Sequence, residues 1–91
     1  MQQAEGRFLI VNELGMHARA AAKLVRLASQ FECAVSVEKD GQRADAKSVM
    51  GVLLLCGQKG AEILVRAEGP EAERAVGEIG ALIRDRFHEE R

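Results

Sequence analysis

The chain has no tryptophan or tyrosine, and its 91 residues include only 3 phenylalanines. Proteins that bind single-stranded nucleic acid stack bases on aromatic rings, so this scarcity weighs against such a function. The 13 basic and 14 acidic side chains nearly cancel, to a net charge of -1. No excess of one sign would draw the chain to nucleic acid or to an anionic membrane, and we expect neither as a partner.

Long apolar runs are also absent. The longest, Val52–Cys56, is too short to span a bilayer. Residues 1–6 contain no basic region followed by an apolar stretch, so we expect no signal peptide and a cytoplasmic location.

Cysteine is scarce, with only Cys33 and Cys56. Neither belongs to a paired-cysteine motif or has a histidine at ligand spacing, and each lies in an apolar pattern. This favours buried reduced thiols over a metal site or a disulfide. We expect no metal and no cofactor.

What is present indicates a globular chain, with 47% apolar and 30% charged residues. The length suits one small domain over residues 1–91, with a single core if helices cover one face of a sheet.

Changes of hydrophobic period divide the chain into strands and helices. Four runs are predicted to be strands: Phe8–Val11, Ala34–Lys39, Gln42–Asp45 and Glu62–Glu68. Three helices are predicted: one from Ala18, a short one from Ser48 that closes near Gly57, and one that starts at Gly69-Pro70-Glu71 with the proline in its first turn. The order β-α-β-β-α-β-α predicts an α+β fold in which the helices cover one face of a four-stranded antiparallel sheet.

Each long helix has a predicted buried face. In the first helix this face is Ala18, Ala21, Ala22, Val25 and Ala28, with Arg19, Lys23, Arg26 and Gln30 toward solvent. In the last helix it is Ala72, Ala75, Val76, Ile79, Leu82 and Ile83. Gly77 and Gly80 should weaken this helix by about 1 kcal/mol each, unless they allow closer packing on the sheet.

His17, one of 2 histidines, lies where a glycine-containing loop meets the first turn of the first predicted helix. A ring nitrogen there faces free backbone N–H groups and the positive end of the helix dipole, which would stabilise an attached anion. Arg19 can grip a phosphate through two parallel hydrogen bonds, and Lys23 adds a point charge. The site is suited to receive a phosphoryl group, although spacing alone equally allows a solvated histidine without a role.

A second sequence motif follows the one around His17 and spans Ala46–Gly57. With His17-Ala18-Arg19 and the spacing between the two, the chain resembles the HPr family, the histidine-containing phosphocarriers of the bacterial phosphoenolpyruvate phosphotransferase system. The resemblance runs from about Phe8 to about Phe87. It implies an open-faced β-sandwich, in agreement with the predicted element order.

The resemblance also implies a mechanism. His17 would accept a phosphoryl group on Nδ1 from phosphorylated enzyme I and pass it to enzyme IIA or IIB components. Arg19 would orient the phosphate, the backbone amides of Ala18 and Ala20 would receive its oxygens, and Asn12 would order the loop. The family usually has proline where this chain has Ala20, so the transfer rate and partner preference are open.

Ser48 allows two interpretations. Local sequence favours a simple helix cap. The run Lys47–Gly51 resembles the regulatory serine site of family members that are targets of HPr kinase/phosphorylase, so we expect Ser48 to be a regulatory phosphorylation site.

A partner-binding surface is expected beside His17. Its predicted members are Met16, Lys23, Lys47, Val49 and Met50. Leu53 and either Leu14 or Met16 could complete an apolar patch, but Leu53–Leu55 should belong at least partly to the core. Met16, Val49 and Met50 are the residues that we expect to be exposed.

Two function classes remain. The first is a phosphocarrier that acts between enzymes, as a monomer. The second is a regulatory binding protein, of the nitrogen-related branch or controlled by the kinase, whose phosphorylation state is read by partners such as a transcriptional regulator. A free-standing enzyme is disfavoured because there is no second catalytic group or metal cluster in the sequence. His88 should be exposed and receives no function.

Overall fold

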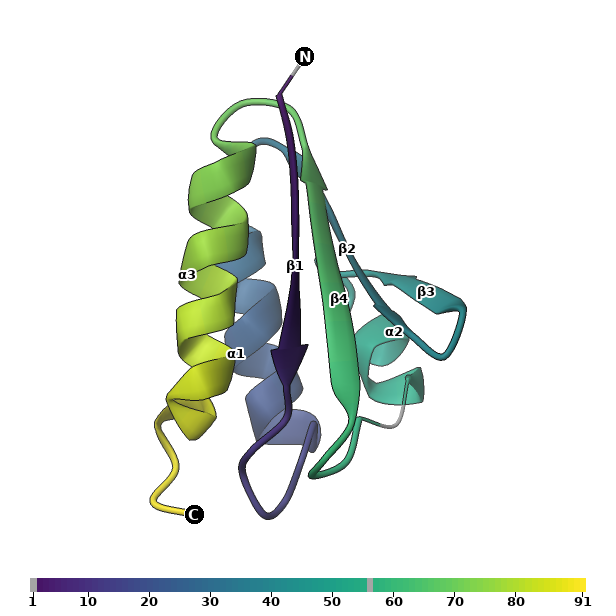
Figure 1. Cartoon of the computed structure of the whole chain (residues 1–91), viewed down its shortest axis with the longest axis vertical. Coiled ribbons are helices and arrows are strands. Elements are labelled where there is room, and N and C mark those ends of the chain that lie inside the picture. Colours follow the sequence, from purple (N-terminus) through teal and green to yellow (C-terminus); the bar gives the residue numbers. More distant parts are fainter. Residues whose placement is uncertain (1, 56) are drawn as a thin grey trace.

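The computed structural model describes residues 2–55 and 57–91 (Figure 1). In chain order the elements are strand β1 (Gln3–Leu9), helix α1 (Ala18–Ala28), strands β2 (Ala34–Lys39) and β3 (Gln42–Asp45), helix α2 (Val49–Leu54), strand β4 (Glu62–Glu68), helix α3 (Ala72–Arg84) and the short turn η1 (Arg86–His88). The predicted order and the α+β fold class are confirmed.

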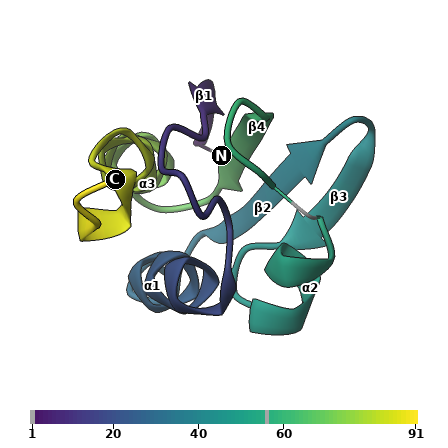
Figure 2. The same ribbon diagram turned by 90° about the horizontal axis from the view of Figure 1, so that it is seen from below.

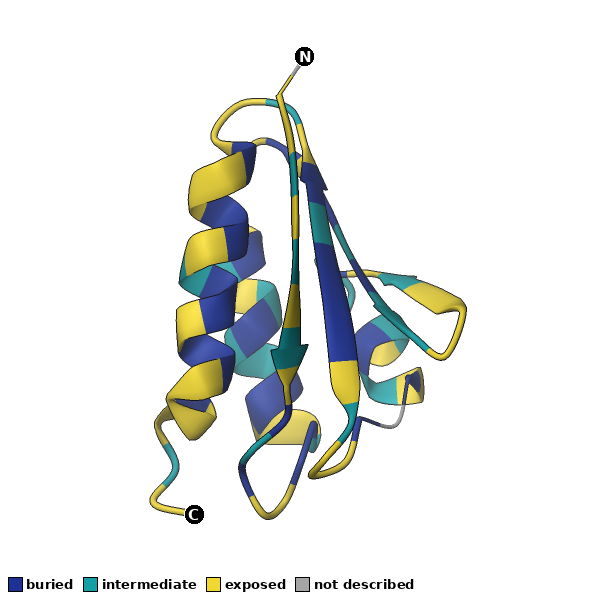
Figure 3. Ribbon diagram, viewed as in Figure 1, coloured by how far each residue is buried: buried dark blue, intermediate teal, exposed yellow. Residues whose placement is uncertain are grey.

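The sheet has the strand order β1-β4-β2-β3, and every neighbouring pair is antiparallel. The helices lie together on one face of it (Figure 2). Every second residue of a strand points to this face. The buried ones on the central strands β2 and β4 are Val35, Val37, Ile63, Val65 and Ala67. The core therefore lies between the sheet and the helices, and Figure 3 shows α3 buried on the side toward the sheet.

Strand β1 differs from its predicted bounds of Phe8–Val11. It begins earlier and ends earlier because β4 pairs with it along its whole length, from Gln3 opposite Glu68 to Leu9 opposite Glu62. A partner strand satisfies the backbone groups of the polar residues at the start of β1, which local apolar content does not reveal. The chain leaves the sheet after Leu9 and enters the loop that leads to His17.

The buried face of α1 is rotated from the predicted one. Ala20, Ala21, Leu24 and Ala28 are buried, whereas Ala18 is exposed and Ala22 and Val25 are half-buried. Helix α1 packs against both α2 and α3, so these two neighbours help to set its orientation. The predicted solvent-facing residues Arg19, Arg26 and Gln30 are exposed, but Lys23 is half-buried.

Helix α3 buries all the residues predicted for its inner face. A Cβ on Gly80 would lie 2.2 Å from Cε1 of Phe8, so this glycine allows α3 to approach β1. A Cβ on Gly77 would have no atom within 4 Å, so packing does not require a glycine at this position. Pro70 was predicted in the first turn of the helix, which is wrong. It lies in a turn closed by the Ala72 N–H and the Gly69 carbonyl, and α3 begins only at Ala72.

Ser48 caps α2, as predicted, and its Oγ accepts a hydrogen bond of 3.1 Å from the Gly51 N–H. The helix ends at Leu54, earlier than predicted. Cys33 is buried, as predicted, and Cys56 lies outside the described residues. Within residues 2–55 and 57–91, no helix has the length and hydropathy of a transmembrane span.

Candidate functional site

The loop between β1 and α1 is held against the segment that follows α2. Gly15 has a φ of +65°, and a Cβ on it would lie 2.6 Å from the Gly57 carbonyl oxygen. The neighbouring Met16 N–H donates a hydrogen bond to that same oxygen. A left-handed conformation at such close range suits glycine alone. Gly15 thereby brings His17 to the first turn of α1.

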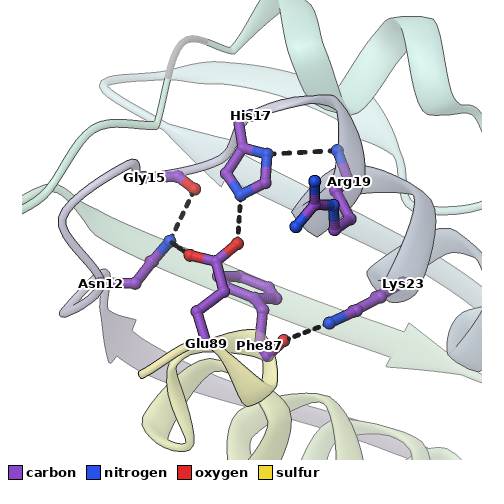
Figure 4. A network of polar contacts seen from close by, with 7 residues as sticks. All are labelled: Asn12, Gly15, His17, Arg19, Lys23, Phe87 and Glu89. Atoms are coloured by element: carbon purple, nitrogen blue, oxygen red, sulfur yellow. Dashed lines mark hydrogen bonds and ion pairs between the residues drawn. The ribbon is translucent and has the colours of Figure 1, made fainter. Parts of the chain in front are cut away.

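His17 is the N-cap residue of α1 (Figure 4). Its Nδ1 accepts a hydrogen bond of 3.2 Å from the Arg19 N–H, and its carbonyl accepts the first helical bond, of 2.8 Å, from the Ala21 N–H. A ring nitrogen that accepts a hydrogen bond carries a lone pair and no proton. In the neutral ring the proton is therefore on Nε2, and Nδ1 carries the lone pair.

The opposite ring nitrogen faces the carboxylate of Glu89. His17 Nε2 donates to Glu89 Oε2, and Glu89 Oε1 accepts a hydrogen bond of 2.9 Å from Asn12 Nδ2. The pair is largely shielded, with side-chain exposures of 25% for His17 and 13% for Glu89. Each ring nitrogen thus has its own partner, and together they select one tautomer.

The electrostatic setting favours an ionised Glu89. Burial alone would raise the pKa of its carboxyl. The hydrogen bonds from His17 and Asn12 and the nearby charges of His17 and Lys23 outweigh that effect, so this pKa lies below its ordinary value.

Asn12 orders the loop, as predicted, and also contacts the C-terminal segment. It is fully buried, and its Nδ2 donates to the Gly15 carbonyl at 2.9 Å as well as to Glu89. Both partners are acceptors, so the amide group can point only its nitrogen toward them. Its Oδ1 has no hydrogen-bond partner among residues 2–55 and 57–91.

The cationic groups near His17 differ in their availability. The Arg19 side chain is exposed, and within the described part of the chain its guanidinium has no ion-pair or hydrogen-bond partner. Lys23 was predicted to face solvent, which is wrong, because its Nζ donates to the Phe87 carbonyl at 2.6 Å. Arg19 is therefore free to bind an anion, whereas the Lys23 ammonium holds the C-terminal segment.

Backbone donors complete the site. Ala18, Arg19 and Ala20 are the first residues of α1, so their amides lie in the turn that has no intrahelical acceptors. Ala20 occupies the first turn, as predicted, and its side chain is fully buried.

Apolar side chains are exposed in the His17 loop and on α2. Leu14, Met50 and Leu54 are 71%, 66% and 71% exposed, and Val49 is 37% exposed. Met16 was predicted to be exposed, which is wrong, because only 7% of it is accessible. The bond from its N–H to Gly57 draws the residue toward the core, and Leu14 takes the outer position instead.

The remaining predicted residues lie as follows. Lys47 is half-buried, and its Nζ donates to the Phe31 carbonyl at 2.7 Å. Leu53 is half-buried and Leu55 is buried, as predicted for the core, whereas Leu54 is exposed and does not belong to it. His88 is exposed, as predicted, and its Nδ1 lies 2.7 Å from Asp85 Oδ2.

Sequence reasoning missed Glu89. It is 72 positions from His17, in a run of charged residues with no local pattern. The only signal is Phe87, an isolated aromatic residue after the last helix, which is fully buried and anchors this segment.

Comparisons with known proteins found relatives over most of the chain. The family model described as "PTS HPr component phosphorylation site" matches residues 4–85. The phosphocarrier protein HPr of Cupriavidus necator is 42% identical over 80 residues, covering 88% of this chain and 90% of that protein. The phosphocarrier protein NPr of Escherichia coli K12 is 43% identical over 82 residues, covering 89% and 91%. The crystal structure of HPr-C-His from Thermoanaerobacter tengcongensis superposes with a TM-score of 0.93 at 39% identity, covering 97% of this chain and 99% of that one.

Proposed function

The chain belongs to the HPr family of phosphocarrier proteins of the phosphotransferase system, and from this premise we propose that His17 carries the phosphoryl group on Nδ1. The observation that supports this assignment most directly is the hydrogen bond from the Arg19 N–H to Nδ1. It leaves the lone pair of Nδ1 directed at the N-terminus of α1, where an anion is favoured.

In the proposed transfer, the Nδ1 lone pair attacks the phosphorus of a phosphohistidine on enzyme I. The bond from phosphorus to the donor nitrogen breaks, and its electron pair stays with the donor. The new phosphoryl oxygens replace Nδ1 as acceptors for the Arg19 amide and take hydrogen bonds from the amides of Ala18 and Ala20. The exposed Arg19 guanidinium orients the group.

Transfer to the next protein requires that the phosphoryl group is held only moderately. A helix N-terminus stabilises an anion by about 0.3–1 kcal/mol at an exposed site, and one arginine adds a charge-assisted hydrogen bond. These contributions orient the group without trapping it. The same attack by a lone pair on phosphorus then passes the group to a histidine or cysteine of an enzyme IIA or IIB component. In this role the chain acts between enzymes, as a cytoplasmic monomer.

The partner surface that we propose is Leu14, Val49, Met50 and Leu54. Leu14 belongs to the His17 loop, and the others lie on α2, which packs against α1. Exposed methionine and leucine side chains adapt to several partners, as a carrier requires. Met16 supports this surface from beneath. Lys23 and Lys47 contribute positive charge near its edges while their ammonium groups hold backbone carbonyls.

A regulatory role is the second candidate, and the position of Ser48 favours it. Its Oγ caps α2 directly before Val49 and Met50, so a phosphate there would place negative charge at the edge of the partner surface. The N-terminus of α2 would accept that charge. In this role HPr kinase/phosphorylase modifies Ser48, and a transcriptional regulator reads the modified form.

The deciding experiment for the first role is incubation with phosphoenolpyruvate and enzyme I, followed by intact-mass and acid-lability analysis. We expect one acid-labile phosphoryl group on the wild-type chain and none on His17→Ala. The His88→Ala variant is the matched control, since it removes the other histidine, and it should be phosphorylated normally. Phosphorylation of His17→Ala, or none of the wild type by an enzyme I that phosphorylates a known HPr, would contradict the assignment.

A further inference from the structure

The C-terminal segment after α3 is tied to the His17 loop. Glu89 bridges His17 and Asn12, the Glu13 N–H donates to the Arg91 carbonyl at 3.2 Å, and Lys23 holds the Phe87 carbonyl. Figure 4 shows the carboxylate of Glu89 between the imidazole and the Asn12 amide. Glu89 lies beyond residues 4–85, so it is outside the part of the chain that the family model matches.

This segment adopts a backbone conformation that L-residues avoid. Arg86, Phe87 and His88 have φ angles of 57°, 53° and 65°, and none of them is glycine. Such a run persists only when surrounding contacts determine it, and strain of this kind concentrates at functional sites. Here the buried Phe87 ring anchors the segment, and the conformation turns Glu89 back toward α1.

From this geometry we propose that Glu89 is a positioning residue, which keeps a proton on His17 Nε2 throughout the transfer cycle so that Nδ1 alone exchanges the phosphoryl group. The inference rests on the proposed function, since it describes how the acceptor is prepared. It assigns a role to a residue that never contacts the phosphoryl group, because the carboxylate and the phosphoryl group lie at opposite ring nitrogens.

The cycle then needs no proton transfer. On acceptance, the Nδ1 lone pair forms the bond to phosphorus while Nε2 keeps its hydrogen, so the ring becomes a cation that faces the Glu89 carboxylate. On donation, the N–P bond breaks, its electron pair returns to Nδ1, and a neutral imidazole leaves. Without the Nε2 proton the leaving group would be an imidazolate anion, which is a far poorer leaving group. The carboxylate keeps Nε2 of the phosphorylated ring protonated, so the leaving group is the neutral imidazole.

Two variants of Glu89 separate the effect of its hydrogen bond from that of its negative charge. Glu89→Gln keeps an oxygen that can accept the Nε2 proton but removes the negative charge, and Glu89→Ala removes both. Glu90→Gln is the matched control, since it neutralises the exposed neighbouring residue. Circular dichroism and thermal unfolding verify that each variant is folded.

The first readout is the tautomer of His17, measured by long-range ¹H–¹⁵N spectra at a pH well above the ordinary imidazole pKa of about 6.5. We expect the Nε2–H form to dominate in the wild type, Glu90→Gln and Glu89→Gln, and both tautomers to be populated in Glu89→Ala. A purely structural role for Glu89 would change stability without changing this ratio.

The second readout is the rate of phosphoryl transfer from the phosphorylated chain to an enzyme IIA. Glu89→Ala should be slower by about tenfold, the effect of losing one hydrogen bond to a charged group, with Glu89→Gln between it and the wild type. The proposal is overturned if Glu89→Ala keeps both the wild-type tautomer ratio and the wild-type rate. If only the role of Glu89 is wrong, the wild type is still phosphorylated on His17. If the proposed function is wrong, the wild type is not phosphorylated at all.

Discussion

At the scale of single residues, the two nitrogens of His17 have different partners and hence different tasks. The Arg19 N–H faces Nδ1, and the Glu89 carboxylate faces Nε2. In the proposed transfer, the nitrogen at the first contact attacks phosphorus, and in the proposed role of Glu89 the nitrogen at the second contact keeps its proton. The chemistry of this residue therefore depends on one local backbone group and one distant side chain.

Ser48 offers a residue-scale test of regulation. In Ser48→Asp a carboxylate oxygen can still cap α2, so the helix should persist while negative charge is added beside Val49 and Met50. Ser48→Asn is the matched control, because it has the same shape and capping ability without the charge. We expect Ser48→Asp to accept phosphate from enzyme I roughly tenfold more slowly than Ser48→Asn, measured by rapid quench, through slower association with the partner. Equal rates for the two variants would rule out charge at this position as the regulatory signal.

At the scale of elements, α3 packs closely against β1. The Phe8 ring lies between Gly80 of α3 and Gly6 of its own strand, where added Cβ atoms would come within 2.2 Å and 2.9 Å of ring carbons. The Arg84 guanidinium covers the ring at 5.4 Å from its centroid. The ring is confined on several sides, so it cannot easily move away from a larger residue.

The two helical glycines of α3 make a matched pair for this packing. Gly80→Ala should destabilise the chain by about 1–3 kcal/mol, because the new methyl group overpacks the Phe8 ring. Gly77→Ala should stabilise it by about 0.5–1 kcal/mol, because this position is exposed and the helix gains only the better propensity. Urea unfolding measures both changes. A destabilising Gly77→Ala or a stabilising Gly80→Ala would contradict this account of α3.

For some elements, the local sequence pattern was enough to predict the bounds correctly. The observed bounds of β2, β3 and β4 equal the predicted ones. Alternation within a strand and the turn residues Asp40 and Gly41, which have positive φ between β2 and β3, are properties of neighbouring residues. The bounds of β1 and the buried face of α1 were wrong because they depend on β4 in the first case and on α2 and α3 in the second. Tertiary pairing outweighed local propensity at both places.

At the scale of the whole molecule, two segments that are far apart in the sequence meet at the site. The loop before α1 and the segment after α3 are joined through Asn12, His17 and Glu89, across 72 positions of sequence. Ordering of the segment after α3 is thus coupled to the state of the His17 ring. A change in the charge of Glu89 should therefore change the free energy of unfolding of the chain.

This coupling predicts a pH dependence of unfolding. The pKa of Glu89 is lowered from 4.5 in the folded chain, so the unfolded chain binds this proton more readily. The stability from the ionised carboxylate is therefore fully present above the unfolded value and is lost as the pH falls through the lower folded value. We expect the wild type to be more stable than Glu89→Gln at neutral pH.

The measurement is urea unfolding of the two proteins from neutral pH downward, with Glu90→Gln as the control. The difference between wild type and Glu89→Gln should shrink below pH 4.5, the ordinary value for the carboxyl group. A difference that stays constant through this range, or one that grows, would mean that Glu89 is not stabilised as an anion in the folded chain.

The sequence by itself determined the parts of this protein that depend on neighbouring residues. These are the order of elements, the placing of His17 at a helix start after Gly15, the Ser48 cap and the inner face of α3. Hydrophobic period, capping and turn preferences act over a few positions, so they can be read along the chain.

Only the tertiary structure decided which side chains surround those positions. It buried Met16, directed Lys23 to a backbone carbonyl, and brought Glu89 to Nε2 of His17. A residue 72 positions away leaves no periodic signal, because its contact depends on how α3 crosses β1 and where the chain then turns. The histidine at the helix start was therefore visible in the sequence, whereas the carboxylate that faces its Nε2 became visible only in the folded chain.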